Sequence, residues 1–181
     1  MGLKAGQGVL VPAMTFAATA EVVRYLGAVP ILVDCDQESG NLDLVDEERK
    51  LVASQTGEGL PSLVGPRAVV GLIPVHVGGL MLDVKAVKAF AARNGLWIVE
   101  DAAHAFPAAW RSDEREEWQR CGAGTANVSC FSFYANKTMT TGEGGMAVTE
   151  DAEIAARMKQ MSLHGLSRDA WDRYSGGGSW D

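Results

Sequence analysis

Hydrophobic residues along the chain form short continuous runs, and longer amphipathic stretches lie between these runs. The runs are typical of buried strands, and they predict strands at 9–12, 30–34, 68–74, 96–101, 128–134 and 146–149. The amphipathic stretches predict helices at 15–26, at 43–54, after Asp83 and at 151–163. The two remaining long segments, 55–66 and 107–127, are rich in polar residues or in glycine and proline, so we expect loops there.

Local signals support the ends and faces of several predicted helices. Gly27 is a typical stop for the first helix. Asp83 can cap a helix in which the apolar side chains share one face, namely Val84, Val87, Phe90 and Ala91. In the last helix, Ile154, Met158 and Met161 are spaced so that they also fall on one side.

Strands that alternate with helices, and that are apolar throughout, indicate an α/β fold. We expect a three-layer α/β/α sandwich whose sheet is mostly parallel, because only such a sheet is covered on both faces. Ligands in these sheets bind beyond the carboxyl ends of strands. Two predicted strand ends carry polar side chains, at 100–104 and at 132–137. These two segments are therefore the candidates for a functional site.

Composition narrows the class of protein further. The 181 residues are 47% hydrophobic and carry a formal net charge of −7, which argues against a nucleic-acid-binding surface. No apolar run approaches the length of a membrane span, and the first residues lack the apolar region of a signal peptide. The three cysteines are widely spaced and suggest neither a disulfide framework nor a zinc site. We therefore expect a cytoplasmic protein that does not enter a membrane.

Lys137 is the first candidate for chemistry. It follows the apolar run 128–134 and precedes a turn rich in threonine and glycine. A lysine that is partly withdrawn from water becomes a nucleophilic amine that can form a Schiff base. The alternative, a surface lysine at the end of a strand, is open on position alone.

Asp101 and Ser132 are the other polar residues at these strand ends. Asp101 either caps the following segment or faces a cationic ligand; an aspartate beneath a pyridine nitrogen keeps that nitrogen protonated. Ser132 lies between two phenylalanines, and its hydroxyl either donates to a phosphate or occupies an ordinary polar position of the strand.

Several other kinds of site lack support in the sequence. Gly142, Gly144 and Gly145 do not match either nucleotide-binding glycine pattern, so a tight turn is the simpler interpretation. His76, His104 and His164 are too scattered to predict a metal site, and we expect no metal. The serine-hydrolase pattern Gly-x-Ser-x-Gly is absent.

Taken together, five segments resemble the DegT/DnrJ/EryC1/StrS family of pyridoxal-phosphate (PLP)-dependent sugar aminotransferases of fold type I. They occur in the family's order and approximate spacing over nearly the whole chain. The segments are VPAMTFAAT at 11–19, PVHVGG at 74–79, VEDAAHA at 99–105, FSFYANKTMTTGEGGM at 131–146 and LHGLSR at 163–168. The most specific part is Asp101 together with Lys137, with Ser132 five residues before the lysine.

The resemblance implies a role for each matching residue. Lys137 matches the Schiff-base lysine, which also moves the proton, and Asp101 matches the partner of the pyridinium nitrogen. The remaining matches are cofactor contacts: His104 near the phenolic oxygen, Ser132 at the phosphate, and Phe16 and Ala103 on the two ring faces. The glycines after Lys137 would let the backbone approach closely without a side-chain clash.

The resemblance also implies a reaction and partners. We expect an amino group to pass from glutamate to a keto group of a nucleotide-diphospho-deoxysugar. The resemblance favours position 4 of the sugar for this keto group. It also implies a homodimer with shared sites. The family's phosphate-gripping N-terminal segment and its smaller C-terminal domain have no counterpart in 1–181, so we expect these residues to be part of the PLP-binding large domain. Two alternatives stay open: an incomplete fragment or non-catalytic regulator with this fold, and a nicotinamide-dependent sugar oxidoreductase, although the glycine fingerprint of the latter is missing.

Overall fold

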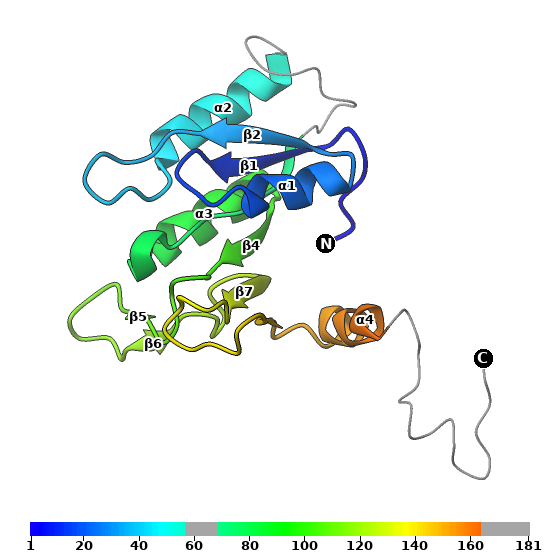
Figure 1. Ribbon diagram of the computed structural model, residues 1–181. Helices are drawn as coiled ribbons and strands as arrows, with labels where there is room; N and C mark the ends of the chain where they lie inside the picture. The colour runs from blue at the N-terminus through cyan, green and yellow to red at the C-terminus, as the bar shows by residue number, and fades with distance from the viewer. Residues whose placement is uncertain (57–68, 164–181) are drawn as a thin grey trace. The chain divides into compact units, whose positions relative to one another are not determined.

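The computed structural model describes residues 1–56 and 69–163 (Figure 1). The chain divides into two compact units, Met1–Thr149 and Glu150–Asp181, and each unit is described by itself. Residues 57–66 of the loop predicted at 55–66, and most of the motif at 163–168, lie outside the described residues. Among the helices that the structure describes, none combines the length and apolar character needed to span a bilayer.

The first unit is built on one mixed sheet with the strand order β2-β1-β3-β4-β7-β8. All neighbouring pairs are parallel except β7 with β8, which are antiparallel. The bounds of these strands are β1 Gly8–Pro12, β2 Val29–Val33, β3 Val69–Leu72, β4 Trp97–Asp101, β7 Val128–Ser132 and β8 Gly145–Val148. The predicted mostly parallel sheet is thereby confirmed.

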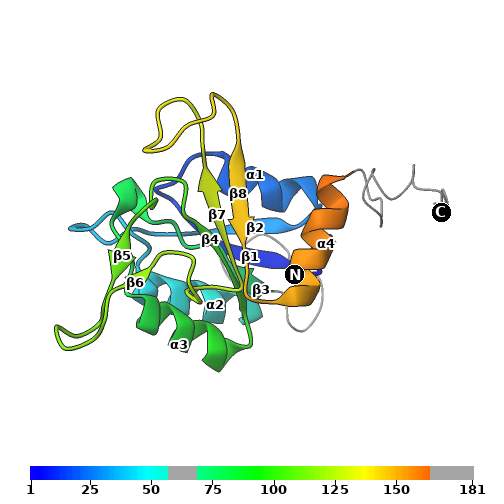
Figure 2. The ribbon, with the colours of Figure 1, turned by 90° about the horizontal axis from the view of Figure 1, so that it is seen from below.

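Helices cover both faces of this sheet. Helix α1 (Ala18–Tyr25) places Val23 against Val9, Val11 and Ile73 on one face. On the other face, α2 (Leu44–Thr56) and α3 (Val84–Asn94) enclose the larger cluster around Leu10 and Leu72. Figure 2 shows α1 on one side of the strands and α2 and α3 on the other. The three layers predicted from the apolar strands are therefore present.

Helix α3 forms where its sequence predicts it. The side chain of Asp83 accepts a hydrogen bond of 3.0 Å from the backbone N–H of Ala86. The four apolar side chains predicted to share a face are all buried, namely Val84, Val87, Phe90 and Ala91. Gly95 ends the helix in the left-handed region at φ 64°, where glycine is favoured.

Several predicted boundaries are wrong in detail. Helix α1 begins at Ala18 rather than at residue 15, because Thr15 to Ala17 form the bend that leaves β1. Helix α2 continues to Thr56, two residues beyond its predicted end. Strand β7 stops at Ser132 rather than at residue 134, although the N–H of Phe133 still bonds to the carbonyl of Gly144 in the register of β7 with β8.

The segment 107–127, predicted to be irregular, contains a short antiparallel pair. Strand β5 (Ala109–Trp110) pairs with β6 (Gln119–Arg120). Strands of two residues are too short to show an alternating pattern, so the sequence could not indicate them. A short 3₁₀ turn, η1 (Val77–Gly79), lies between β3 and α3.

The second unit contains helix α4 (Ala152–Ser162). Its N-terminus is capped by Asp151, whose carboxylate accepts from the N–H groups of Glu153 and Ile154. The predicted helix at 151–163 is therefore confirmed.

Candidate active site

Two neighbouring parallel strands bring the polar strand ends together. In the register of β4 with β7, Asp101 lies opposite Cys130. Residues that pair side by side in parallel strands face the same side of a sheet, and every second residue repeats that face. Ser132 therefore shares the face of Asp101. Burial and then the nearby Asp101 and Glu100 carboxylates raise the pKa of the Cys130 thiol.

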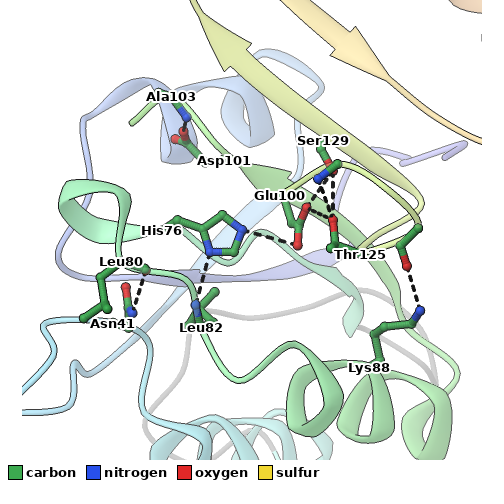
Figure 3. A network of polar contacts seen from close by, with 12 residues as sticks. Asn41, His76, Leu80, Leu82, Lys88, Glu100, Asp101, Ala103, Thr125 and Ser129 are labelled. Atoms are coloured by element: carbon green, nitrogen blue, oxygen red, sulfur yellow. Dashed lines mark hydrogen bonds and ion pairs between the residues drawn. The ribbon is translucent and has the colours of Figure 1, made fainter. Parts of the chain in front are cut away.

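Asp101 is held by donors on both of its oxygens. The hydroxyl of Thr19, in α1, donates to Oδ2 at 2.6 Å. The backbone N–H of Ala103 donates to Oδ1 at 3.1 Å, as Figure 3 shows. The carboxylate is half-buried on the α1 face at the carboxyl end of β4. This is the position in which an open α/β sheet binds ligands.

Lys137 lies in a turn that is tied back to the sheet. The N–H of Phe133 donates to the carbonyl of Gly144, and the N–H of Thr141 donates to the carbonyl of Phe133, both at 2.9 Å. Lys137 itself donates its backbone N–H to Tyr134. Its side chain is half-buried, and within residues 1–56 and 69–163 the ammonium makes no hydrogen bond or ion pair. The turn thus presents an amino group that has no partner among the described residues.

Glycine is required at two positions of this turn. A Cβ on Gly145 would lie 2.7 Å from the carbonyl oxygen of Phe131. At Gly144, φ is 155° and a Cβ would lie 2.4 Å from the hydroxyl oxygen of Thr141. An added side chain at either position would collide with a neighbouring atom of the protein.

The other candidate residues lie on segments that leave the same end of the sheet. Ser132 ends β7, and its hydroxyl accepts from the N–H of Tyr134 at 3.2 Å. Ala103 is half-buried and His104 exposed, both just after β4, while Phe16 precedes α1 with 80% of its side chain exposed. Asp101 is joined to Ala103 by a hydrogen bond, and Ser132 lies on the same face of the sheet, two residues beyond Cys130, which pairs with Asp101. No hydrogen bond or ion pair among the described residues joins Asp101 to Lys137, His104 or Phe16.

A second carboxylate, that of Glu100, comes from the residue before Asp101 in β4 and points to the opposite face of the sheet (Figure 3). Its Oε2 accepts hydrogen bonds of 2.6 Å from the hydroxyls of Thr125 and Ser129. Its Oε1 lies 3.3 Å from Nε2 of His76, a contact too poorly aligned to count as a full hydrogen bond. Burial opposes ionisation, but His76 and the two hydroxyls outweigh it and hold the pKa of Glu100 below its ordinary value. Glu100 is thus a buried carboxylate that hydrogen-bond donors of the protein hold in place.

The His76, Glu100 and Cys121 side chains place potential metal-ligand atoms within 4.8 Å of one another. The tautomer of His76 argues against a metal at this point. The N–H of Leu82 donates to Nδ1, so in this arrangement the imidazole proton is on Nε2 and points toward Glu100. A metal would need the lone pair of Nε2, and it would need the thiolate of Cys121, whose pKa is raised to about 12 by burial and by Glu100. His76 is better described as a buried core histidine.

Sequence reasoning missed Thr19 and the Glu100 network. Thr19 lies one helical turn after Thr15, and it is 4% exposed. A threonine pair at this spacing at the start of a helix was the available signal. For Glu100, the signal was the alternation of faces along a strand, which turns two consecutive acids in opposite directions.

The contact between Asp101 and Cys130 can be tested directly. Replacing Asp101 by asparagine is expected to lower the pKa of the Cys130 thiol, because a negative neighbour that opposes thiolate formation is removed. The rate of alkylation as a function of pH measures this, in a background in which Cys35 and Cys121 are replaced by serine and alanine. An unchanged profile would show that the charge of Asp101 does not act on the Cys130 thiol.

The fold and these contacts define an α/β protein in which an acid and a lysine lie beyond the carboxyl ends of adjacent parallel strands. The profile of the DegT/DnrJ/EryC1/StrS aminotransferase family matches residues 1–178. The chain therefore belongs to this family. Its mostly parallel sheet between helices corresponds to part of a fold type I domain of PLP-dependent aminotransferases.

Individual relatives agree with this assignment. The chain is 38% identical, over 99% of its length, to the spore coat polysaccharide biosynthesis protein SpsC of Bacillus subtilis, of which it covers 41%. It is similar to the solved structure of DesV from S. venezuelae, with 33% identity, a TM-score of 0.77 and coverage of 98% of this chain and 42% of DesV. It is also similar to DesI, solved in the presence of its TDP-sugar product, with 30% identity, a TM-score of 0.69 and coverage of 97% of this chain and 39% of DesI. The chain thus spans about two fifths of these relatives.

Proposed function

We propose that residues 1–181 are part of the PLP-binding large domain of a sugar aminotransferase. The observation that carries the proposal is the β4–β7 register, which puts Asp101 and Ser132 on one face directly before the turn that bears Lys137. The family assignment supports an aminotransferase, and the names of SpsC and DesI support a sugar as the substrate class.

The residues of this site fit PLP in charge and in surface. The Asp101 carboxylate, fixed by two donors, suits a cationic ring nitrogen. The Lys137 side chain has no partner among the described residues, and its neutral amine would form an imine with an aldehyde by loss of water. The exposed ring of Phe16 and the small side chain of Ala103 suit the two faces of a flat ring. Ser132 would contact the phosphate and His104 the phenolic oxygen.

Each residue would then have a defined task. When bound, PLP supplies an electron sink that stabilises negative charge at the substrate carbon bearing the amino group. Asp101 would hold a proton on the ring nitrogen, and Lys137, once released, would move a proton at Nζ. For the whole protein we propose glutamate as amino donor and a 4-keto nucleotide-diphospho-deoxysugar as acceptor. We also propose that it works as a homodimer with shared sites, in the cytoplasm.

The test is whether PLP attaches to Lys137. The purified chain incubated with PLP is expected to turn yellow, and borohydride should bleach it and leave a pyridoxyl group on the peptide that contains Lys137, as mass spectrometry would show. Lys137→Ala should lose both signals. The matched control is Lys50→Ala, which removes another half-buried lysine, in α2, and should keep them.

Three outcomes would distinguish the aminotransferase from the non-catalytic alternatives. A reducible adduct that persists in Lys137→Ala on another lysine would reject Lys137 as the attachment point. A wild-type chain that never colours would favour the non-catalytic alternative. Coloured protein that forms no 2-oxoglutarate from glutamate, with a TDP-4-keto-deoxysugar as acceptor, would favour a regulator that binds the cofactor without turnover.

A further inference from the structure

A chain of hydroxyl groups runs from the start of α1 to Asp101. The Oγ1 of Thr15 lies 2.6 Å from the Oγ1 of Thr19, and the Oγ1 of Thr19 lies 2.6 Å from Oδ2 of Asp101. Thr19 is 4% exposed, so water cannot easily replace either partner. Both distances are at the short end for hydroxyl hydrogen bonds, and for the bond from Thr19 to Asp101 this is expected because the acceptor is charged.

The number of hydroxyl hydrogens determines which residue is the donor in each of these two hydrogen bonds. A threonine hydroxyl has one hydrogen, and an ionised carboxylate can only accept. The hydrogen of Thr19 must therefore point to Asp101, so the hydrogen between the two threonines belongs to Thr15. Thr15 in this way prevents Thr19 from rotating away from the carboxylate.

The two donors on Asp101 come from different elements. Thr19 holds Oδ2 from α1, and the N–H of Ala103 holds Oδ1 from the segment after β4. One donor would leave the carboxylate free to rotate about its last bond, whereas two donors on opposite oxygens fix its plane. A ligand can then bind only the lone pairs of the Asp101 oxygens that these two donors leave free.

We propose that Thr19, oriented by Thr15, is a positioning residue that holds the Asp101 carboxylate in the orientation needed to bind a cationic ring nitrogen. The inference rests on the proposed function, since PLP would supply that nitrogen. Thr19 itself touches Asp101, and it acts on the cofactor only through that carboxylate.

The protein offers a closely matched control for Thr19. Thr125 donates a hydrogen bond of the same length, 2.6 Å, to the neighbouring carboxylate Glu100, and it is also buried, but on the opposite face. Thr19→Val and Thr125→Val thus each remove one hydroxyl from a carboxylate while keeping the shape of the side chain. A general loss of stability should affect both variants, whereas a loss of positioning should affect only the first.

PLP affinity and the visible spectrum of the bound cofactor are the first measurements. Thr19→Val should weaken PLP binding about tenfold, since hydrogen bonds to charged groups are worth more than neutral ones, while Thr19→Ser should stay within about threefold of wild type. Thr125→Val should bind PLP within about threefold of wild type, because Glu100 faces away from the site. The spectrum of bound PLP should change in Thr19→Val in the same direction as in Asp101→Asn.

A double variant tests whether Thr19 acts through Asp101. Adding Thr19→Val to Asp101→Asn should weaken binding by no more than about twofold beyond Asp101→Asn alone. Full additivity of the two losses would overturn the proposal. Equal losses in Thr19→Val and Thr125→Val, or failure of Thr19→Ser to restore binding, would also overturn it.

A measurement without cofactor separates this inference from the proposed function. In the proton NMR spectrum of the chain without PLP, the hydroxyl proton of Thr19 should exchange slowly with water, and its signal should shift in Asp101→Asn. If wild type binds no PLP, the proposed function fails, and this signal still decides whether Thr19 holds Asp101. A Thr19 hydroxyl proton that exchanges too fast to be seen would overturn the hydrogen-bond chain itself.

Discussion

Replacing Glu47 by leucine is expected to raise the free energy of unfolding at pH 7 by about 2 to 4 kcal/mol. Glu47 lies in the first turn of α2 and is fully buried, and neither of its carboxylate oxygens has a hydrogen-bond partner among the described residues. Burial, helped by the charge of Glu48, raises its pKa from 4.5 to about 8. The folded chain therefore holds an uncompensated acid, which leucine would replace with an apolar side chain of similar size.

The same residue should make stability depend on pH in a defined window. Below pH 4.5 Glu47 is protonated in both states. Between pH 4.5 and about 8 the unfolded chain releases this proton while the folded chain keeps it, so the free energy of unfolding should fall as pH rises. The slope approaches about 1.4 kcal/mol per pH unit, and it vanishes above the folded pKa.

Urea unfolding at a series of pH values measures this effect. Glu47→Gln should remove the decline across the window, and the difference from wild type isolates Glu47 from the other acids. Glu117→Gln is the control, because it makes the same change at an exposed position outside α2 and should shift stability by less than about 0.5 kcal/mol. Parallel curves for wild type and Glu47→Gln would show that Glu47 is ionised or paired in the folded chain.

Replacing Gly71 by alanine is expected to destabilise the chain by about 2 to 3 kcal/mol. Gly71 pairs with Trp97 across β3 and β4, and the indole lies over the glycine. A Cβ at position 71 would lie 2.2 to 2.4 Å from three ring carbons of Trp97. The ring would have to leave the cluster that it packs against on the α1 face, which includes Val9 and Val11.

A pair of backgrounds tests this explanation. In Trp97→Ala the ring is gone, so Gly71→Ala should there be neutral or slightly stabilising, since alanine suits a strand interior better than glycine. Equilibrium unfolding of wild type, the two single variants and the double variant gives the coupling free energy between positions 71 and 97. Equal losses in both backgrounds would mean that something other than the indole requires glycine at this position.

The parts of the fold that the sequence predicted depend on local signals. Helix α3 has a cap at Asp83, one apolar face and a glycine stop at Gly95, and each signal lies within its own few residues. The β5–β6 pair was missed because it depends on an approach between Ala109 and Arg120 that leaves no local pattern. The burial of Glu47 could not be predicted either, because a charged residue on an amphipathic helix ordinarily faces water.

For the candidate site, the sequence predicted the residues better than their surroundings. Asp101 and Ser132 were found because polar residues at the ends of apolar strands are conspicuous. That they share a face follows from the pairing of β4 with β7, which joins segments about thirty residues apart and is not encoded in either one. Thr19 was missed for the same reason, since its partner lies 82 residues away in the sequence.

The two consecutive acids that end β4 have a consequence for how the sheet assembles. If β4 slid by a single position along its neighbours, Glu100 would meet the α1 side and Asp101 the His76 side. Each carboxylate would then lose its hydroxyl donors, and stranding a buried charge in this way costs about 3 to 5 kcal/mol. The acid pair therefore favours a single register of β4, and a sheet in which β4 is shifted by one residue should be less stable than the native sheet.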